Sequence, residues 1–354
     1  MRKNIFLFST TIIITIIFLE YFLRVFYPQN LTGWYAERDH SGINILKNNI
    51  NYFHRINNRN IRYTFGNFHN RDTDTINLNK KKILVLGDSF AFGWLINDED
   101  TYIHLLQKKF DDYYFINSSV PGWGLADQVR YIENYCKEIN PEKVIIMLNT
   151  DDIVRAWLSS SYKVQIKDLK NYKNNILIEG KANPLNYNSS FHQIPFYKFF
   201  IKNSHLMVFT RQIIIDFKYG KLILNNKVKT KDYVNEKFDI PSQSLGKEND
   251  KSIILAKLLY LRLKKLIEDC DSKLIIIYSG WYNYNLNDKN PTLIFLKEAK
   301  NFFENYNIKY YDFTEEMKDV HDNYNNYLIP HDGHPNEKGH KIIAEKIIEN
   351  IKLN

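Results

Sequence analysis

The stretch ILVLGDS, residues 83–89, joins a short apolar run to a polar turn. Ile83–Leu86 is continuously apolar, which is typical of a strand buried on both faces of a parallel sheet. Ser89 follows this strand directly. Ligands of open α/β sheets bind at the carboxyl ends of the strands. We therefore predict that Ser89 lies at the functional edge of a parallel sheet.

Strand and helix patterns alternate on the C-terminal side of this stretch. The predicted strands cover residues 113–116, 144–148, 274–278 and 308–313, and the predicted helices cover 101–110, 125–139, 252–270, 292–306 and 337–351. Such alternation is typical of a parallel sheet covered by helices on both faces. The expected fold class is α/β, a three-layer α/β/α sandwich that comprises residues 81–354.

Two segments fall outside this alternation. Residues 28–80 are polar and rich in Asn, and we expect an irregular lead-in that is partly β-strand. Residues 155–250 interrupt the sheet pattern with prolines, Asn, Lys and an aromatic cluster over 191–200. An insertion of this length is usually functional in a compact domain. It could form a lid or stack on sugar rings, and aromatic packing in the core explains the cluster equally well.

The N-terminus predicts a membrane anchor. Arg2 and Lys3 precede a mostly apolar run over residues 5–27, which Glu20 and Arg24 interrupt. A spanning helix needs about 20 apolar residues, and no small-residue cleavage site of a signal peptide follows. Glu20 and Arg24 are four residues apart and can pair on one helix face. We expect an uncleaved, single-pass signal anchor over residues 1–27, with a buried soluble helix as the alternative.

This topology would keep Arg2 and Lys3 in the cytoplasm. The rest of the chain would then be extracytoplasmic, in the periplasm or at the cell surface.

Charge and cysteine content exclude several classes. The net charge of +8 comes from 48 basic and 40 acidic residues, which are interleaved, so we expect a solvated surface and no nucleic-acid partner.

Cys136 and Cys270 are too few for a disulfide framework. Both fall on predicted helices, so buried thiols are the default, and a single bridge in an oxidising compartment stays open. The His and Cys spacing predicts no metal site, and we expect no cofactor.

A second polar motif, Asp332-Gly333-His334, directly precedes the last predicted helix. A serine hydroxyl becomes nucleophilic when a neutral imidazole takes its proton, and a third group must fix the tautomer of that imidazole. Both ends of the domain can converge at one sheet edge. We therefore predict Ser89 as nucleophile, His334 as base and Asp332 as the orienting acid.

These motifs resemble those of the SGNH (GDSL-like) hydrolases, in a membrane-anchored bacterial branch. Gly87-Asp88-Ser89 with Gly93 is similar to the first block of that family. Residues 117–122 are similar to the second block, and residues 332–335 to the fifth. The resemblance covers residues 81–150 and 252–350. It implies a flavodoxin-like sheet and an oxyanion hole formed by the backbone N–H groups of Ser89 and Gly122.

Two positions depart from the family pattern. The third block normally supplies an Asn amide to the oxyanion hole, but an ungapped alignment places Asp151 there. An ionised carboxylate only accepts hydrogen bonds and would repel an oxyanion. Burial could keep Asp151 protonated, Asn149 could substitute, or two backbone N–H groups could suffice. The family also commonly spaces its acid and base as D-x-x-H, whereas this chain has D-x-H.

The expected function is that of a serine esterase. It would act on acyl esters, above all acetyl esters, of cell-surface glycans or lipids through an acyl-enzyme. The D-x-H spacing resembles that of polysaccharide O-acetyltransferases, so acyl transfer to a sugar is the first alternative. Asp151 keeps a second alternative open, a binding or assembly protein on an inactive scaffold. His340, beside Gly339, is expected to be a surface or capping residue.

Overall fold

A computed structural model describes residues 2–29, 31, 35–56, 59–72, 80–159, 161–180, 196–211, 213–214, 217, 245–281, 289–317, 320, 323, 326–329 and 332–352. The chain divides into two compact units. One unit, named the anchor unit after the membrane anchor that the sequence predicts, comprises residues 1–35, 55–60 and 186–234. The other, named the sheet unit, comprises 36–54, 61–185 and 235–354.

Five parallel strands form the centre of the sheet unit. They are β5 (Lys81–Leu86), β6 (Tyr113–Asn117), β7 (Lys143–Leu148), β10 (Lys273–Tyr278) and β11 (Lys309–Asp312). Their order across the sheet is β11-β10-β7-β5-β6. Counted along the chain this order is 2-1-3-4-5, the flavodoxin-like arrangement. The predicted α/β fold with a parallel sheet is confirmed.

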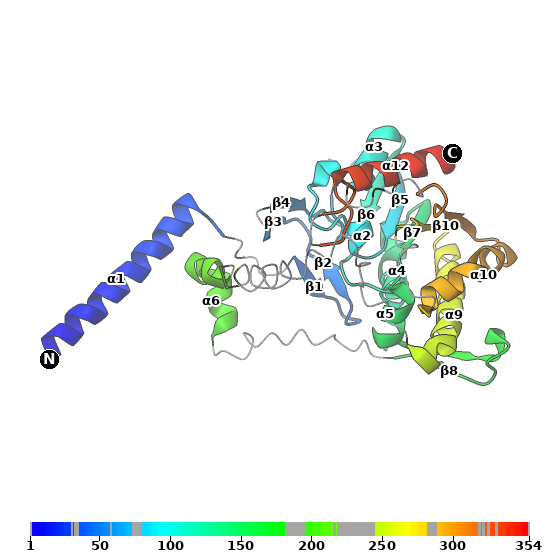
Figure 1. Ribbon diagram of the computed structural model, residues 1–354, viewed down its shortest axis with the longest axis horizontal. Coiled ribbons are helices and arrows are strands. Elements are labelled where there is room, and N and C mark those ends of the chain that lie inside the picture. The colour runs from blue at the N-terminus through cyan, green and yellow to red at the C-terminus, as the bar shows by residue number, and fades with distance from the viewer. Residues whose placement is uncertain are drawn as a thin grey trace. The chain divides into compact units, whose positions relative to one another are not determined.

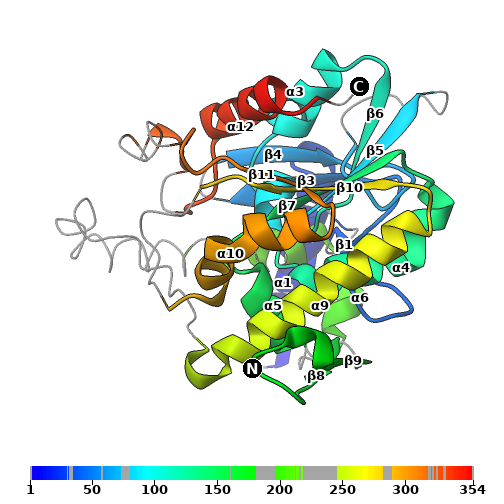
Figure 2. The same cartoon turned by 90° about the vertical axis from the view of Figure 1, so that its right-hand side faces the viewer.

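Helices cover both faces of this sheet (Figures 1 and 2). One face carries α3 (Tyr102–Lys109) and α12 (Glu337–Asn350), and the other carries α4 (Leu125–Ile139), α5 (Asp152–Ser159), α9 (Asn249–Glu268) and α10 (Pro291–Asn305). Because both faces are covered, every residue of β6 and β7 is buried, which explains why 113–116 and 144–148 are continuously apolar. The expected three layers are present.

Local sequence signals set several helix starts. Asn290 precedes Pro291, and its side chain accepts hydrogen bonds from the backbone N–H groups of the first turn of α10. Asn336 caps α12 in the same way. A side-chain oxygen at this position satisfies N–H groups that have no partner inside the helix. These caps explain why both helices begin near the predicted residues.

The lead-in, expected to be irregular and partly β-strand, contains two antiparallel strand pairs. β1 (Ala36–Arg38) pairs with β2 (Asn44–Leu46), and β3 (Asn51–Ile56) pairs with β4 (Arg59–Thr64). Residues 73–79 lie outside the described residues.

The structure describes part of the expected insertion. Its expected start at about residue 155 falls inside α5, because the apolar face of residues 152–159 packs as a further helix. A hairpin of β8 (Tyr162–Gln165) and β9 (Ile176–Glu179) follows, with the 3-10 turn η2 (Tyr172–Asn174) between its strands. The turn η4 (Gly246–Glu248) leads into α9. Residues 181–195 and 218–244 of the expected insertion lie outside the described residues.

The anchor unit contains one long apolar helix, α1 (Arg2–Phe26), and the short helix α6 (Tyr197–Asn203). Residues 205–211 are also helical. Lys3–Phe26 is long and apolar enough to cross a membrane, and none of its most apolar window is buried. The predicted pair on this helix is present, since Arg24 Nη2 lies 3.3 Å from Glu20 Oε1.

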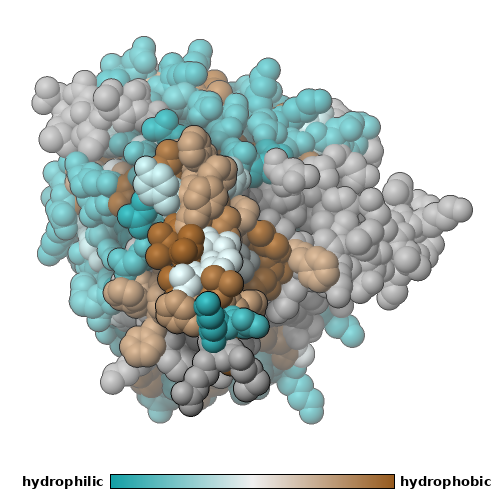
Figure 3. Space-filling model, turned by 90° about the vertical axis from the view of Figure 1, so that its left-hand side faces the viewer, coloured by the Kyte–Doolittle hydropathy of each residue, from teal (hydrophilic) through white to brown (hydrophobic). Residues whose placement is uncertain are grey.

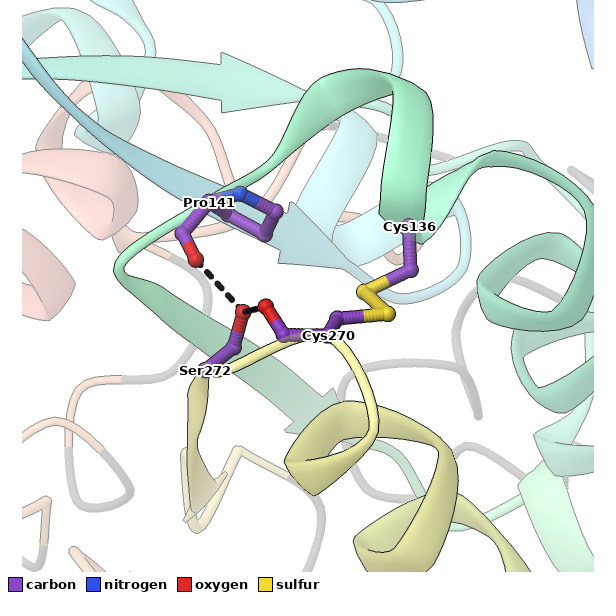
Figure 4. The surroundings of a disulfide bond; sticks show 4 residues. All are labelled: Cys136, Pro141, Cys270 and Ser272. Atoms are coloured by element: carbon purple, nitrogen blue, oxygen red, sulfur yellow. Dashed lines mark hydrogen bonds between the residues drawn. A yellow bond between two sulfur atoms is a disulfide. The ribbon is translucent and has the colours of Figure 1, made fainter.

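The default prediction of two free thiols is wrong. Cys136 and Cys270 form a disulfide whose Cα atoms are 6.3 Å apart (Figure 4). Cys136 lies in the last turn of α4, and Cys270 lies in the turn after α9 instead of inside that helix. The two helices pack side by side on one face of the sheet. This packing, which local sequence does not encode, brings the two sulfur atoms together.

Candidate active site

Ser89 opens α2 (Ser89–Phe92), a single turn directly after β5. Asp88 caps this turn, because its Oδ1 accepts a hydrogen bond from the Phe90 backbone N–H at 2.9 Å. Gly93 ends the turn with a φ of 82°, in the left-handed region that favours glycine. A Cβ atom there would also lie 2.9 Å from Arg71 Nη1. The turn thus places Ser89 at the carboxyl edge of the sheet.

This position is also the switch point of the sheet. β5 lies between β6 and β7, so the chain leaves β5 toward one side and returns on the other. Crevices for ligands form at such points because the loops after the two central strands diverge. Ser89 follows β5, and Asp151 follows β7.

A tight loop before α12 carries His334. Ile329 donates its backbone N–H to His334 O at 2.8 Å, and Asp332 donates its own to Ile329 O at 3.1 Å. The side chain of Asn336 donates to Leu328 O at 3.1 Å while it caps the helix. These bonds hold the D-x-H motif in one conformation.

The structure brings together Ser89, His334 and Asp332. His334 Nε2 lies 2.8 Å from Ser89 Oγ, and His334 Nδ1 lies 2.5 Å from Asp332 Oδ1. An ionised carboxylate can only accept, so Nδ1 carries the proton and Nε2 is left to accept the hydroxyl hydrogen of Ser89. This is the tautomer in which an imidazole can act as a general base.

The environment keeps Asp332 ionised. Burial raises the pKa of Asp332, but hydrogen bonds and charge from His334 and a hydrogen bond from the Trp94 side chain outweigh burial, so the pKa lies below its ordinary value. The His334 ring packs against Phe90, with ring centroids 4.8 Å apart, and lies 6.2 Å from Trp94. No sequence motif marks Trp94, which follows Gly93 in the turn after Ser89.

A residue of the lead-in, His54, packs against Trp94. His54, on β3, lies edge-on to Trp94 with ring centroids 4.7 Å apart, and its Nδ1 is 3.1 Å from the hydroxyl of Tyr63. Burial lowers the pKa of His54 to about 4, although the charge of Asp332 acts in the opposite direction. His54 is therefore neutral near pH 7. No motif in the lead-in predicted this role.

A buried arginine organises the loop after the nucleophile. Arg71 is fully buried and ion-paired with Asp98 at 2.7 Å. Its Nη1 donates to Phe92 O at 2.9 Å and to Gly93 O at 2.6 Å, and its Nη2 donates to Ile96 O. A buried charge is tolerated when it is paired and fully hydrogen-bonded. These bonds hold the loop that follows Ser89, including Trp94.

Two backbone N–H groups are free to receive an oxyanion. Within the described part of the chain, neither Ser89 N nor Gly122 N has a hydrogen-bond partner. Gly122 is exposed and adopts a φ of 88°, and no atom lies within 4 Å of the position a Cβ would take. An oxyanion hole needs unpaired N–H donors, so these two groups remain the candidates for that role.

The polar residues after β7 are already engaged. Asn149 Nδ2 donates to Asp88 Oδ2 at 2.6 Å, so this amide is committed to Asp88. Arg155, on α5, places Nη1 at 2.8 Å from Asp88 Oδ2 and Nη2 at 3.1 Å from Asp151 Oδ2. Burial raises the pKa of Asp151, Arg155 lowers it and the charge of Asp88 raises it, with a net rise. No sequence motif marks Arg155.

Asp152, the first residue of α5, has a structural role. It is fully buried, and its Oδ2 accepts from Asn149 N at 3.0 Å and from Gln128 Nε2 at 3.3 Å. Burial raises the pKa of Asp152 well above its ordinary value. Across the described ranges, no three His, Cys, Asp or Glu side chains cluster as metal ligands.

For His340, the expected surface position is wrong, whereas the expected capping role is present at another helix. His340 is fully buried, and its Nδ1 accepts a hydrogen bond from the Tyr102 backbone N–H at 3.2 Å. It therefore caps the start of α3, a helix far away in the sequence. The packing of α12 against α3 buries it, and burial lowers the pKa of His340 to about 3.

The sequence matches no family model and no curated protein. Among solved structures, the chain is similar to a member of the lipolytic G-D-S-L family from Veillonella parvula, with 13% identity, a TM-score of 0.42, and coverage of 77% of this chain and 100% of that chain. It is similar to an acetyl xylan esterase with the same identity, TM-score and coverage. A psychrotrophic esterase from Pseudoalteromonas shares 14% identity, with a TM-score of 0.39 and coverage of 76% and 96%.

Proposed function

We propose that this chain is a membrane-anchored serine esterase of the SGNH type, with Ser89 as its nucleophile. The observation that carries this proposal is the hydrogen-bonded series from Ser89 Oγ through His334 to Asp332. The hydroxyl and the imidazole belong to residues 245 positions apart in the sequence. A surface turn would explain the Gly87-Asp88-Ser89 motif or the Asp332-Gly333-His334 motif taken singly. It would not explain why the side chains of the two motifs are hydrogen-bonded to each other.

The reaction follows from this geometry. Ser89 Oγ attacks the ester carbonyl while His334 Nε2 takes its proton, and Asp332 stabilises the imidazolium. The backbone N–H groups of Ser89 and Gly122 receive the oxyanion. His334 then returns the proton to the leaving alcohol, and an acyl-Ser89 ester forms. Water attacks this ester with His334 again as base, which releases the acid and restores Ser89.

We further propose that the substrates are acyl esters, acetyl esters among them, of cell-surface glycans or lipids. Residues 1–27 form the anchor in this proposal, and the sheet unit is extracytoplasmic. The apolar helix α1 supports the anchor. The Cys136–Cys270 disulfide supports an oxidising compartment, because cytosolic thiols are kept reduced. Transfer of the acyl group to a sugar hydroxyl would use the same three side chains.

The test is ester turnover by the full-length protein in detergent micelles, with p-nitrophenyl acetate as substrate. We expect Ser89→Ala to lower kcat at least about 1000-fold, because a nucleophile has no substitute in covalent catalysis. Ser119→Ala is the matched control, since Ser119 is also buried near the sheet edge and its Oγ has no hydrogen-bond partner in the described structure. An organophosphonate should label Ser89 in the wild type.

The outcomes separate the alternatives. Equal turnover by wild type and Ser89→Ala would remove the nucleophile assignment. Absence of turnover and of phosphonate labelling in the wild type would favour a binding scaffold. Adding a soluble oligosaccharide acceptor distinguishes transfer from hydrolysis, because transfer yields an acylated sugar in place of the free acid.

A further inference from the structure

The anchor unit exposes apolar side chains outside its long helix. On and after α6, Phe196 is 77% exposed and Phe199 is 61% exposed, and Phe200, Ile213 and Ile214 are exposed as well. Single exposed apolar side chains are normal on a protein surface. A contiguous patch of them is unusual and marks an interaction surface, because its exposure to water is unfavourable. In Figure 3 apolar side chains, coloured brown, gather on the face turned to the viewer. We call the segment 196–217 the aromatic segment.

Glu20 ties this aromatic segment to the anchor helix. Its carboxylate accepts hydrogen bonds from Ser204 Oγ at 2.8 Å, from His205 N at 3.0 Å and from Leu206 N at 2.9 Å. It therefore caps the helical residues 205–211, where a negative charge is favourable at the N-terminal end of the helix dipole. Arg24 pairs with the same carboxylate at 3.3 Å. An acid inside an apolar helix is costly unless it has such partners.

Two further contacts fix the same junction. The backbone N–H of Gln29 donates to His205 Nδ1 at 2.7 Å. The rings of Tyr27 and Phe209 meet edge to face with their centroids 5.9 Å apart. The aromatic segment is thus attached to the last two turns of α1 and to the residues that follow it. This is the end of the helix at which the chain would leave a bilayer.

We propose that the aromatic segment is a second membrane contact, whose exposed Phe and Ile side chains enter the outer lipid interface beside the anchor. This proposal rests on the anchor in the proposed function. The favoured occupant is a lipid bilayer, because Glu20 ties the aromatic segment and its exposed apolar side chains to the exit end of α1, whose own apolar side chains are exposed. The sequence of the segment also contains three basic residues, Lys198, Lys202 and Arg211, and one acidic residue, Asp216. A mainly apolar sequence with an excess of basic residues is typical of interfacial helices.

The physical consequence is a fixed attachment. A single spanning helix leaves the chain free to rotate about it, whereas a second contact beside the exit point restricts the anchor unit to one orientation on the bilayer. Aromatic side chains favour this depth, where apolar and polar surroundings meet. The attachment would keep the aromatic segment at the lipid surface.

The experiment measures the depth of a fluorophore in the full-length protein. The two native cysteines are bridged, so Phe199→Cys provides the one reactive thiol for a nitrobenzoxadiazole label. The labelled protein is reconstituted into vesicles of phosphatidylcholine and phosphatidylglycerol, with or without doxyl-labelled phosphatidylcholine. The control is Leu169→Cys, which is 57% exposed and lies on the sheet unit.

We expect the label at residue 199 to shift its emission to the blue and to lose most of its intensity to the doxyl lipid. The label at residue 169 should be quenched by aqueous iodide alone. Quenching of the residue 199 label by iodide, with no effect of the doxyl lipid, would overturn the proposal. Shielding from both quenchers would also overturn it, because a second copy of the chain or another protein would then cover the segment.

Glu20→Ala tests the junction. We expect the variant to stay in the vesicles on carbonate extraction and the residue 199 label to lose its blue shift, because the segment is released. Unchanged quenching in Glu20→Ala would contradict the role of Glu20. Release of the wild type by carbonate would instead refute the anchor. Turnover of p-nitrophenyl acetate by the same samples reports the proposed esterase separately.

Discussion

The Asp151 carboxylate lies 3.1 Å from the guanidinium of Arg155, one helical turn further along the chain. The resemblance to the SGNH pattern places Asp151 at the position of an oxyanion-binding Asn, and Arg155 partly neutralises the charge of this carboxylate. The same guanidinium holds Asp88, the residue before Ser89, at 2.8 Å. One arginine therefore links the loop after β5 to the loop after β7.

We predict that Asp151→Asn raises kcat for acetyl-ester hydrolysis about tenfold. An amide can donate to the oxyanion, and one such donor is worth about 100- to 1000-fold where the site is built for it. Asp151→Ala is the control, because it removes the carboxylate without adding a donor. Steady-state kinetics of both variants check the prediction. Equal gains in the two would show that only the negative charge matters.

Replacing Asp332 with asparagine should lower kcat by about four orders of magnitude. The amide introduced by Asp332→Asn could donate to the imidazole, which favours the tautomer with its proton on Nε2 and removes the base. KM should change little, because Asp332 acts through His334, to which its carboxylate is hydrogen-bonded. We would measure kcat and KM with p-nitrophenyl acetate. A loss of less than tenfold would mean that Asp332 does not orient His334.

The lowered pKa of Asp332 also predicts a pH dependence of stability. Because the folded-state pKa lies below the unfolded value of about 3.9, ionised Asp332 stabilises the fold above that pH, and the contribution is lost as the pH falls through the folded-state pKa. The melting temperature of the wild type should therefore exceed that of Asp332→Asn at pH 6 and approach it near pH 3. A constant difference across this range would contradict the assigned ionisation.

Trp94→Phe should lower kcat about two- to tenfold and leave KM unchanged. The variant keeps the aromatic ring but loses the hydrogen bond to Asp332, and one such bond contributes about 0.5–1.5 kcal/mol. With this donor gone, the pKa of Asp332 should rise. The acid limb of the kcat profile should then move to higher pH, which a purely structural defect would not cause.

The control for this prediction is Trp157→Phe, the same replacement on α5. It should leave both kcat and the pH profile unchanged. Similar losses in the two variants would point to a general effect of removing an indole.

Loss of the Cys136–Cys270 disulfide should destabilise the sheet unit by about 2–5 kcal/mol, because the bridge closes a long loop in the unfolded chain. Urea unfolding of the wild type with and without reductant measures this difference. The double variant Cys136→Ser/Cys270→Ser is the control, since reductant should not affect it. Equal unfolding midpoints for the oxidised wild type and the double variant would show that the bridge contributes no stability.

The sequence by itself determined the five strands of the parallel sheet, the helices α3, α4, α9, α10 and α12 that cover it, and the three side chains of the candidate site. Apolar runs and amphipathic spacing are local signals, because the residues that a strand or a helix face buries lie close together in the sequence. For this reason the ranges predicted for α4, β7 and β10 agree with the structure to within one residue at each end. The Asp332 and His334 pair was predictable because both residues lie in one motif beside a capped helix.

Only the tertiary structure decided which distant residues meet. Trp94 contacts Asp332 and His54 contacts Trp94. Arg155 bridges the loops after β5 and β7, and His340 is buried against α3. Glu20 caps a helix that starts about 185 residues later. None of these contacts has a local signature, because each depends on the order of strands in the sheet or on the packing of one helix against another. The disulfide follows the same rule, since the packing of α4 against α9 brings its two sulfur atoms together.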